Sequence, residues 1–244
     1  MLSISIVIPA HNEQDSIRSC LRSVLAQDEM ADRYEVIVVN NASTDATAEI
    51  VLHEFPEVRL INEPRKGLAI AYNRGAAEAR GDIIQFVDAD NLIPNDHLKK
   101  VLCEFNYDPG LIAVSGPYVY SEGDFLCELF IRAMYILVAI PSQFLLNKLL
   151  KRCLIASGNL AVKKEAFQKV KGFNEELFYG LEPDMALKLN KLGNVKFKYG
   201  LSVKSSARRM KKEGAVVVVA KHLLVNLAPS LVGKQFTKAT VDIR

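Results

Sequence analysis

Ile83-Ile84-Gln85-Phe86-Val87-Asp88-Ala89-Asp90 is a largely apolar run that ends in two aspartates one residue apart. A short, nearly continuous apolar run is typical of a strand that is buried on both faces of a parallel sheet. Asp88 and Asp90 would then stand at the carboxyl end of that strand, where such sheets bind ligands. Two carboxylates there suit a hard divalent cation, Mn²⁺ or Mg²⁺, shared with substrate phosphates. The pair alone is weak evidence, because acidic loop residues are usually just solvated.

Apolar runs and helical patterns alternate through the first half of the chain, which predicts an α/β fold. Strands are expected at 3–8, 35–39, 58–61 and 82–87, and helices at 12–27, 43–53 and 68–79. Continuous apolar strands separated by helices predict a Rossmann-like, mostly parallel sheet with helices on both faces. The second half is less regular, with strands expected at 111–115, 154–162 and 195–199, and helices at 125–151 and 183–192.

The bulk composition is that of a globular protein. Half of the 244 residues are hydrophobic, and the net charge of +3 is too small to indicate a nucleic-acid partner. The cysteines form no Cys-x-x-Cys pair and no zinc-like spacing, which favours reduced structural cysteines and a cytoplasmic location. They are Cys20, Cys103, Cys127 and Cys153. The amino terminus has neither a basic lead nor a small-residue cleavage site, so we interpret it as a strand.

Two apolar stretches, 125–150 and 215–232, are interrupted by charged residues, amides and prolines. Neither offers the roughly 20 largely uncharged residues that a spanning helix requires. Both are typical of amphipathic or core helices. The sequence leaves open whether they pack in the core or lie on the inner face of a membrane, as in a peripheral membrane protein.

Polar residues follow three of the predicted strands. They are residues 9–13 after the first strand, 40–45 after the second, and the aspartate pair after the fourth. Each segment taken singly could serve only turn and cap chemistry. Because the carboxyl ends of parallel strands meet at one sheet edge, the three together predict a nucleotide site.

The order of these motifs resembles family 2 glycosyltransferases of the GT-A fold, inverting enzymes that use nucleotide-activated sugars. The matching segments are Ile8-Pro9-Ala10-His11-Asn12-Glu13, residues 38–45, Lys66-Gly67-Leu68-Ala69, Asn73-Arg74-Gly75 and residues 86–90. The resemblance covers roughly residues 3–195. It implies a hexosyltransferase-type enzyme whose partners are a nucleotide-diphosphate sugar donor and an unidentified acceptor, with a lipid-linked acceptor among the candidates.

The resemblance also implies how the nucleotide base is bound. Pro9, Ala10 and His11 would line the base pocket, with the His11 ring against the base. Asn40 or Asn41 would hydrogen-bond the base edge. The family more often has Asp-Asp there, and an asparagine carbonyl still accepts from a uracil or guanine N–H, so the base is left open.

Further residues are assigned by the same resemblance to the diphosphate and the metal. Glu13 would sit close to the base pocket, and Lys66 would approach the diphosphate. Asp88 would lie near the ribose and the metal, and Asp90 would bind Mn²⁺ or Mg²⁺ directly. The cation would neutralise charge as the nucleoside diphosphate departs.

Inversion requires a general base for the acceptor hydroxyl. The family places an aspartate of a Glu-Asp pair at a helix start, where this chain has Leu181-Glu182-Pro183-Asp184. Glu182 falls on the base position and Asp184 two residues later. Acidic residues around a proline are also ordinary helix-start chemistry. The sequence therefore leaves Glu182, Asp184 and neither as alternatives.

On the acceptor and sugar side, the resemblance extends to Ala156-Ser157-Gly158-Asn159 and residues 172–176. It implicates Asn159 and Glu175, although both could serve only turns. Arg208 and Arg209 would belong to a basic arm that closes over the diphosphate. We therefore expect a glycosyltransferase domain at 1–205, with a nucleotide-binding half at 1–116 and an acceptor-side half at 117–205. A C-terminal basic arm and apolar helix would occupy 206–244.

Two other functions compete with sugar transfer. A sugar-phosphate nucleotidyltransferase of similar fold would have a Gly-rich loop with a basic residue after the first strand, where this chain has residues 9–13 instead. A non-catalytic nucleotide- or partner-binding relic would explain why the Glu-Asp pair is absent.

Overall fold

The computed structural model describes residues 2–27, 34–120, 153–177, 180–206 and 208. The predicted helix at 125–151, the stretch at 215–232, Cys127 and Arg209 lie outside the described residues. No helix among the described residues is long and apolar enough to cross a membrane.

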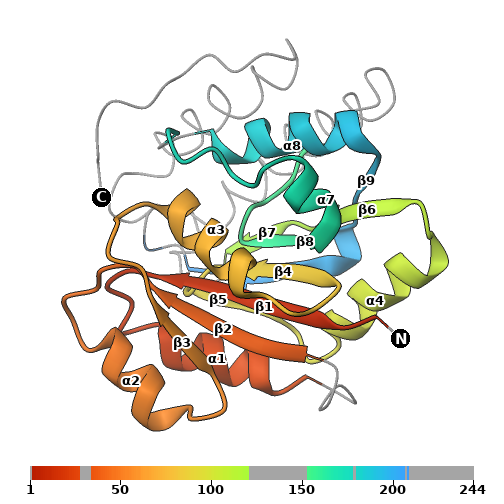
Figure 1. Cartoon of the computed structure of the whole chain (residues 1–244). Coiled ribbons are helices and arrows are strands. Elements are labelled where there is room, and N and C mark those ends of the chain that lie inside the picture. The colour runs from red at the N-terminus through yellow and green to blue at the C-terminus, as the bar shows by residue number, and fades with distance from the viewer. Residues whose placement is uncertain (1, 28–33, 121–152, 178–179, 207, 209–244) are drawn as a thin grey trace.

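A seven-stranded sheet forms the centre of the molecule (Figure 1), in the order β3-β2-β1-β4-β8-β6-β9. The first four strands are parallel, and β8 runs antiparallel between β4 and β6. The predicted mostly parallel α/β sheet is therefore confirmed. The bounds are β1 Ile4–Ala10, β2 Tyr34–Asn40, β3 Arg59–Asn62, β4 Ile83–Val87, β6 Leu111–Ser115, β8 Asn159–Lys163 and β9 Asn194–Phe197.

Helices cover both faces of this sheet, as Figure 1 shows. Alternate β1 side chains divide between two cores because successive strand residues point to opposite faces. Ile6 belongs to the core that β1 shares with α1, α2 and α4, whereas Val7 belongs to the core shared with α3, α7 and α8. The helices are α1 Ile17–Leu25, α2 Thr47–Glu54, α3 Leu68–Glu78, α4 His97–Tyr107, α7 Lys164–Lys169 and α8 Leu181–Leu192, with a 3-10 turn η2 at Tyr199–Leu201.

A second, three-stranded sheet has the order β5-β10-β7, with β5 at Asn91–Leu92, β7 at Tyr118–Tyr120 and β10 at Val203–Ser205. It joins the segment directly after Asp90 to residues more than 100 positions later. Its strands are two or three residues long, too short for a period in the sequence to reveal them.

Two helices begin later than the sequence pattern predicts. α1 begins at Ile17 rather than at residue 12, because Asn12 has a positive φ of 54° and residues 12–14 bond to the segment after β2. α2 begins at Thr47 rather than near Ser43, whose hydroxyl accepts the Asn12 N–H. Both loops after β1 and β2 are thus longer than predicted and are bonded to each other.

His97, at the start of α4, is 1% exposed, and its Nε2 has no hydrogen-bond partner among the described residues. Burial, aided by the charge of Lys100, lowers its pKa from 6.5 to about 4. Between these values the unfolded chain binds a proton that the folded chain does not, so stability falls as the pH drops through this window. We expect His97 to cost about 3 kcal/mol of stability between pH 7 and pH 4.

Chemical denaturation at pH 7 and pH 4 checks this prediction. His97→Leu should lose that part of the pH dependence, whereas His53→Gln, at an exposed position of α2, should keep it. Equal pH dependence in His97→Leu and the wild type would contradict it.

Candidate active site

The carboxyl ends of β1, β2 and β4 lie at one edge of the sheet. Ala10 pairs with Asn40 at the last register position of β1 and β2, and β4 runs parallel on the other side of β1. The three polar segments predicted to converge therefore do so. Pro9 and Ala10 are buried at this edge, and His11 is partly exposed beyond it.

His11 and the asparagines that follow β2 are held by hydrogen bonds within the protein. The His11 ring donates from Nδ1 to the Asn41 carbonyl oxygen, 2.7 Å away. The Asn40 amide donates to the Asn62 side chain at 2.9 Å and accepts the Ser43 N–H at 3.2 Å. Asn40 stays partly exposed, whereas Asn41 is buried.

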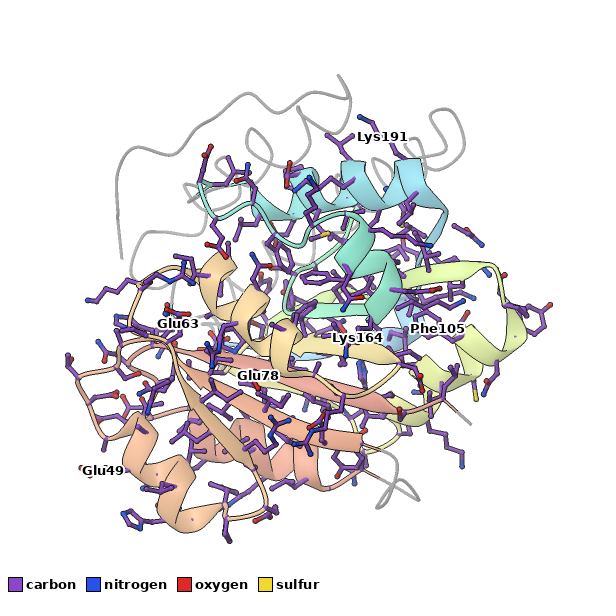
Figure 2. The ribbon with its side chains drawn as sticks, viewed as in Figure 1. Glu49, Glu63, Glu78, Phe105, Lys164 and Lys191 are labelled. Carbon is purple, nitrogen blue, oxygen red and sulfur yellow. The ribbon has the colours of Figure 1, made fainter. Side chains whose placement is uncertain are left out.

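The Asn41 amide organises the loop between β3 and α3. It donates to the carbonyls of Glu63 and Arg65 and accepts the Gly67 N–H at 2.9 Å. Gly67 has a φ of 149°, a conformation that residues with a Cβ rarely adopt. Glu63, labelled in Figure 2, pairs with Arg65 within the loop. Asn41 thus fixes the loop, which presents the exposed side chain of Lys66.

Two tyrosines and a glycine lie against the Asp88 carboxylate. Its Oδ1 accepts a short hydrogen bond from the Tyr72 hydroxyl, and its Oδ2 lies 3.5 Å from the Tyr118 hydroxyl. Tyr118 in turn accepts the Gly158 N–H at 2.8 Å. A Cβ on Gly158 would lie only 2.1 Å from Asp88 Oδ2, so any other residue there would displace this carboxylate.

Asp90 belongs to an acidic cluster beside a single arginine. Burial, followed by the negative charges of Asp88 and Glu13, raises the pKa of Asp90 from 3.8 to about 7. The Arg208 guanidinium opposes this effect from 3.9 Å and donates to both Glu13 oxygens at 2.8 Å. The site thus concentrates negative charge that only one cation among the described groups contacts.

This cluster fits a divalent cation that shares its ligands with a phosphate. Among the described residues, no group of three or more His, Cys, Asp or Glu side chains could hold a metal by itself. Mg²⁺ and similar ions commonly use one or two carboxylates together with substrate phosphates and water. Asp90, with its raised pKa beside two other carboxylates, has the chemistry of such a ligand, because a bound cation would relieve the repulsion.

Glu182 and Asp184 point to different partners from the first turn of α8. Glu182 accepts a hydrogen bond from the Ser157 hydroxyl at 3.3 Å. Its negative charge also lies close enough to interact electrostatically with the hydroxyls of Tyr72 and Tyr118. Asp184 lies 2.7 Å from Lys188 of the same helix. Glu182 is therefore the residue of the two that shares neighbours with Asp88.

The comparison with known families agrees with this geometry. The model described as "Glycosyl transferase family 2" matches residues 5–171. The chain belongs to this family. The matched region contains the β1, β2 and β4 ends, Asp88 and Asp90, and it stops before Glu182.

Curated relatives are similar over much of the chain but are longer proteins. The probable glycosyltransferase YdaM of Bacillus subtilis is 30% identical over 181 residues, which are 71% of this chain and 43% of YdaM. The chondroitin synthase of Pasteurella multocida is 30% identical over 198 residues, 79% of this chain and 19% of the synthase. The chain thus spans less than half of either relative.

Solved structures share the fold. The mannosyltransferase PcManGT from Pyrobaculum calidifontis, in complex with GDP-Man and Mn²⁺, has a TM-score of 0.72 at 23% identity. That likeness covers 98% of this chain and 66% of PcManGT. S. aureus TarS 1–349 with UDP-GlcNAc has a TM-score of 0.67 at 18% identity, covering 84% of this chain and 58% of that one. The predicted GT-A fold is confirmed.

Asn159 and Glu175, the two residues predicted on the acceptor side, are hydrogen-bonded to other parts of the fold. Asn159 is buried in β8 and donates to the Leu201 carbonyl at 2.7 Å. Glu175 accepts from Asn73 at 3.1 Å and lies 3.3 Å from Arg65, so it ties residues 172–177 to the loop before α3.

Tyr72 and Tyr118 contact the candidate site but are not predicted from the sequence, whereas Ser157 lies in the segment 156–159 that resembles the family's acceptor side. Tyr72 sits among the apolar residues of α3, and Tyr118 belongs to a three-residue strand. Ser157 immediately precedes Gly158 in a segment that the sequence pattern assigns to a strand. Nothing in the neighbourhoods of the two tyrosines separates them from core residues, so only the folded structure identifies them.

Proposed function

We propose that this chain is a metal-dependent, inverting glycosyltransferase that moves a sugar from a nucleotide-diphosphate sugar to an acceptor hydroxyl. The observation that carries the proposal is the acidic cluster of Glu13, Asp88 and Asp90 at the sheet edge, with Glu182 close enough to share neighbours with Asp88. The acidic cluster suits activation of the donor, and Glu182 suits removal of the acceptor proton. Inverting transfer requires both tasks.

The donor side is built from the ends of β1, β2 and β4. Pro9, Ala10 and His11 line the base pocket, and Asn40 meets the base edge because it is the more exposed of the two asparagines. Asn41 acts through the loop that it holds. The neighbours' complexes with UDP-GlcNAc and GDP-Man support a nucleotide-sugar donor and leave the base open between uracil and guanine.

Charge around the diphosphate comes from three sources. Asp90 and Asp88 would hold Mn²⁺ or Mg²⁺, and the bound cation would supply positive charge to the departing diphosphate. The Mn²⁺ in the PcManGT complex supports this choice. Lys66 approaches the diphosphate from the loop before α3. Arg208, now paired with Glu13, adds a guanidinium that suits phosphate oxygens.

Glu182 takes the proton from the acceptor hydroxyl as that oxygen attacks the anomeric carbon. The hydrogen bond from Ser157 orients one oxygen of the Glu182 carboxylate. Asp184 is instead ion-paired with Lys188 of the same helix. Asn159 and Glu175 shape the acceptor side through the backbone segments that they hold. These contacts do not distinguish one acceptor from another, lipid-linked acceptors included.

A thermal-shift panel tests the donor site. UDP, GDP, TDP and CDP are added with and without Mn²⁺ to the wild type, to Asp90→Ala and to Asp96→Ala. We expect one nucleotide to raise the melting temperature by several degrees in the presence of metal only, since binding to the folded state stabilises it. The shift should vanish in Asp90→Ala.

Asp96 is the matched control because its exposed carboxylate pairs with Lys100, outside the acidic cluster. Asp96→Ala should keep the nucleotide shift. A shift that needs no metal would contradict the metal site. Absence of any shift in folded wild type would favour a non-catalytic relic.

A further inference from the structure

Asp88 and Glu182 belong to different parts of the fold, yet one dipeptide lies between them. Asp88 follows β4, and Glu182 stands in the first turn of α8. The Ser157 hydroxyl donates to Glu182 at 3.3 Å. The next residue, Gly158, is packed against the Asp88 carboxylate so closely that it has no room for a Cβ. Ser157 and Gly158 therefore touch one carboxylate each.

Gly158 is itself held firmly. Its N–H donates to the Tyr118 hydroxyl at 2.8 Å, and its carbonyl accepts from the Asn91 amide at 3.0 Å. Both partners are in the small sheet that follows Asp90. The dipeptide is thus anchored on the donor side by backbone bonds, so the Ser157 side chain is presented to Glu182 from a fixed position.

Tyr72 holds the Asp88 carboxylate in place through its side chain. Its ring is fully buried, stacked on Phe173 and edge-on to Phe86, each with centroids 4.9 Å away. Its hydroxyl donates to Asp88, just as the Ser157 hydroxyl donates to Glu182. A buried ring packed on both sides in this way has one available orientation, which fixes the hydroxyl against Asp88.

We propose that Tyr72 and Ser157 are positioning residues that set Asp88 and Glu182 in a fixed relation to each other. The proposal rests on the proposed function, in which Asp88 serves the donor and Glu182 serves the acceptor. Transfer requires the acceptor oxygen and the anomeric carbon to meet in near-attack geometry, and a misplacement of about 1 Å can cost roughly 100-fold in rate. A rigid polar bridge between the two carboxylates meets this requirement.

The first arm of the test asks whether the bridge exists, independently of activity. Unfolding is measured for Ser157→Ala, Glu182→Ala and the double variant in metal-free buffer. Coupled residues depart from additivity, and we expect a departure of roughly fivefold in the unfolding equilibrium constant. Additive effects would overturn the proposal whatever the enzyme does.

The second arm measures function by release of nucleoside diphosphate from the donor, with water as acceptor, so that no acceptor need be known. Ser157→Ala should lower kcat about tenfold and leave the donor KM within about twofold, because Ser157 serves the acceptor side. Tyr72→Phe should lower kcat and raise the donor KM, since it also releases Asp88. The variant that combines Tyr72→Phe with Ser157→Ala should be little worse than Tyr72→Phe alone.

Tyr34→Phe is the matched control, because it removes a partly buried hydroxyl that bonds to Leu25 in the opposite core. It should change neither kcat nor KM. Unchanged kcat in Ser157→Ala, or a purely multiplicative double variant, would overturn the positioning role. If the wild type showed neither metal-dependent nucleotide binding nor donor cleavage, the proposed function would be overturned instead. Coupling between Ser157 and Glu182 in unfolding would then report a structural contact only.

Discussion

Asp90→Asn is expected to make the metal-free chain more stable at pH 8 and to abolish its metal-dependent binding of nucleotide. The folded state holds the pKa of Asp90 at about 7, against an ordinary value of 3.8. Between these values the folded chain retains a proton that the unfolded chain has lost, so the stability contributed by Asp90 declines as pH rises from about 4 to 7. The asparagine removes this charge.

The size of the effect follows from the pKa shift. The full shift corresponds to about 4 kcal/mol at about 1.4 kcal/mol per pH unit. Because 26% of the Asp90 side chain is exposed, solvent screening should reduce this to about 2–3 kcal/mol. Urea denaturation in chelator from pH 4 to pH 8 should show the difference from wild type growing with pH and levelling off above 7.

Asp96→Asn supplies the control, since that carboxylate is half exposed and paired with Lys100. It should show no stabilisation at pH 8. If Asp90→Asn were no more stable than the wild type at pH 8, the charge repulsion in the acidic cluster would be much weaker than we infer. The site would then have less need of a cation.

The first half of the fold could be predicted because its strands are buried on both faces and its helices are separated from them by clear polar turns. β1, β2, β3 and β4 lie within two residues of their predicted bounds. The same reasoning missed α4, although Asp96 at its N-cap and the helical spacing of Leu98, Val101, Leu102 and Phe105 are both signals of a helix. It also missed β5, β7 and β10, whose pairing depends on residues far apart in the chain.

The site was predicted as far as the strand ends determine it. Asp88, Asp90 and Glu13 come together because parallel strands deliver their following residues to one edge. The roles of Asn41 and Asn159 as framework residues could not be foreseen, since an asparagine beside a ligand and one that holds a loop look identical in sequence. Tyr72 was missed for a similar reason, because a tyrosine in an apolar helix usually belongs to the core.

Glu182→Gln is expected to lower the rate of sugar transfer about 100- to 10,000-fold while leaving metal-dependent nucleotide binding intact. A general base contributes a factor of this order, and glutamine keeps the shape of the side chain without the ability to accept the proton. The amide oxygen can still accept the Ser157 hydrogen bond, so the local structure should persist. Donor cleavage and the nucleotide thermal shift, measured on the same preparation, separate chemistry from binding.

Asp184→Asn provides the comparison, since it lies two residues away on the same helix and its carboxylate pairs with Lys188. It should cost a small amount of stability through the lost ion pair and change kcat less than about threefold. If Asp184→Asn lost activity and Glu182→Gln retained it, Asp184 would be the base and Lys188 would have to release it on substrate binding. Retained activity in both variants would mean that the proton leaves by a route that uses neither carboxylate.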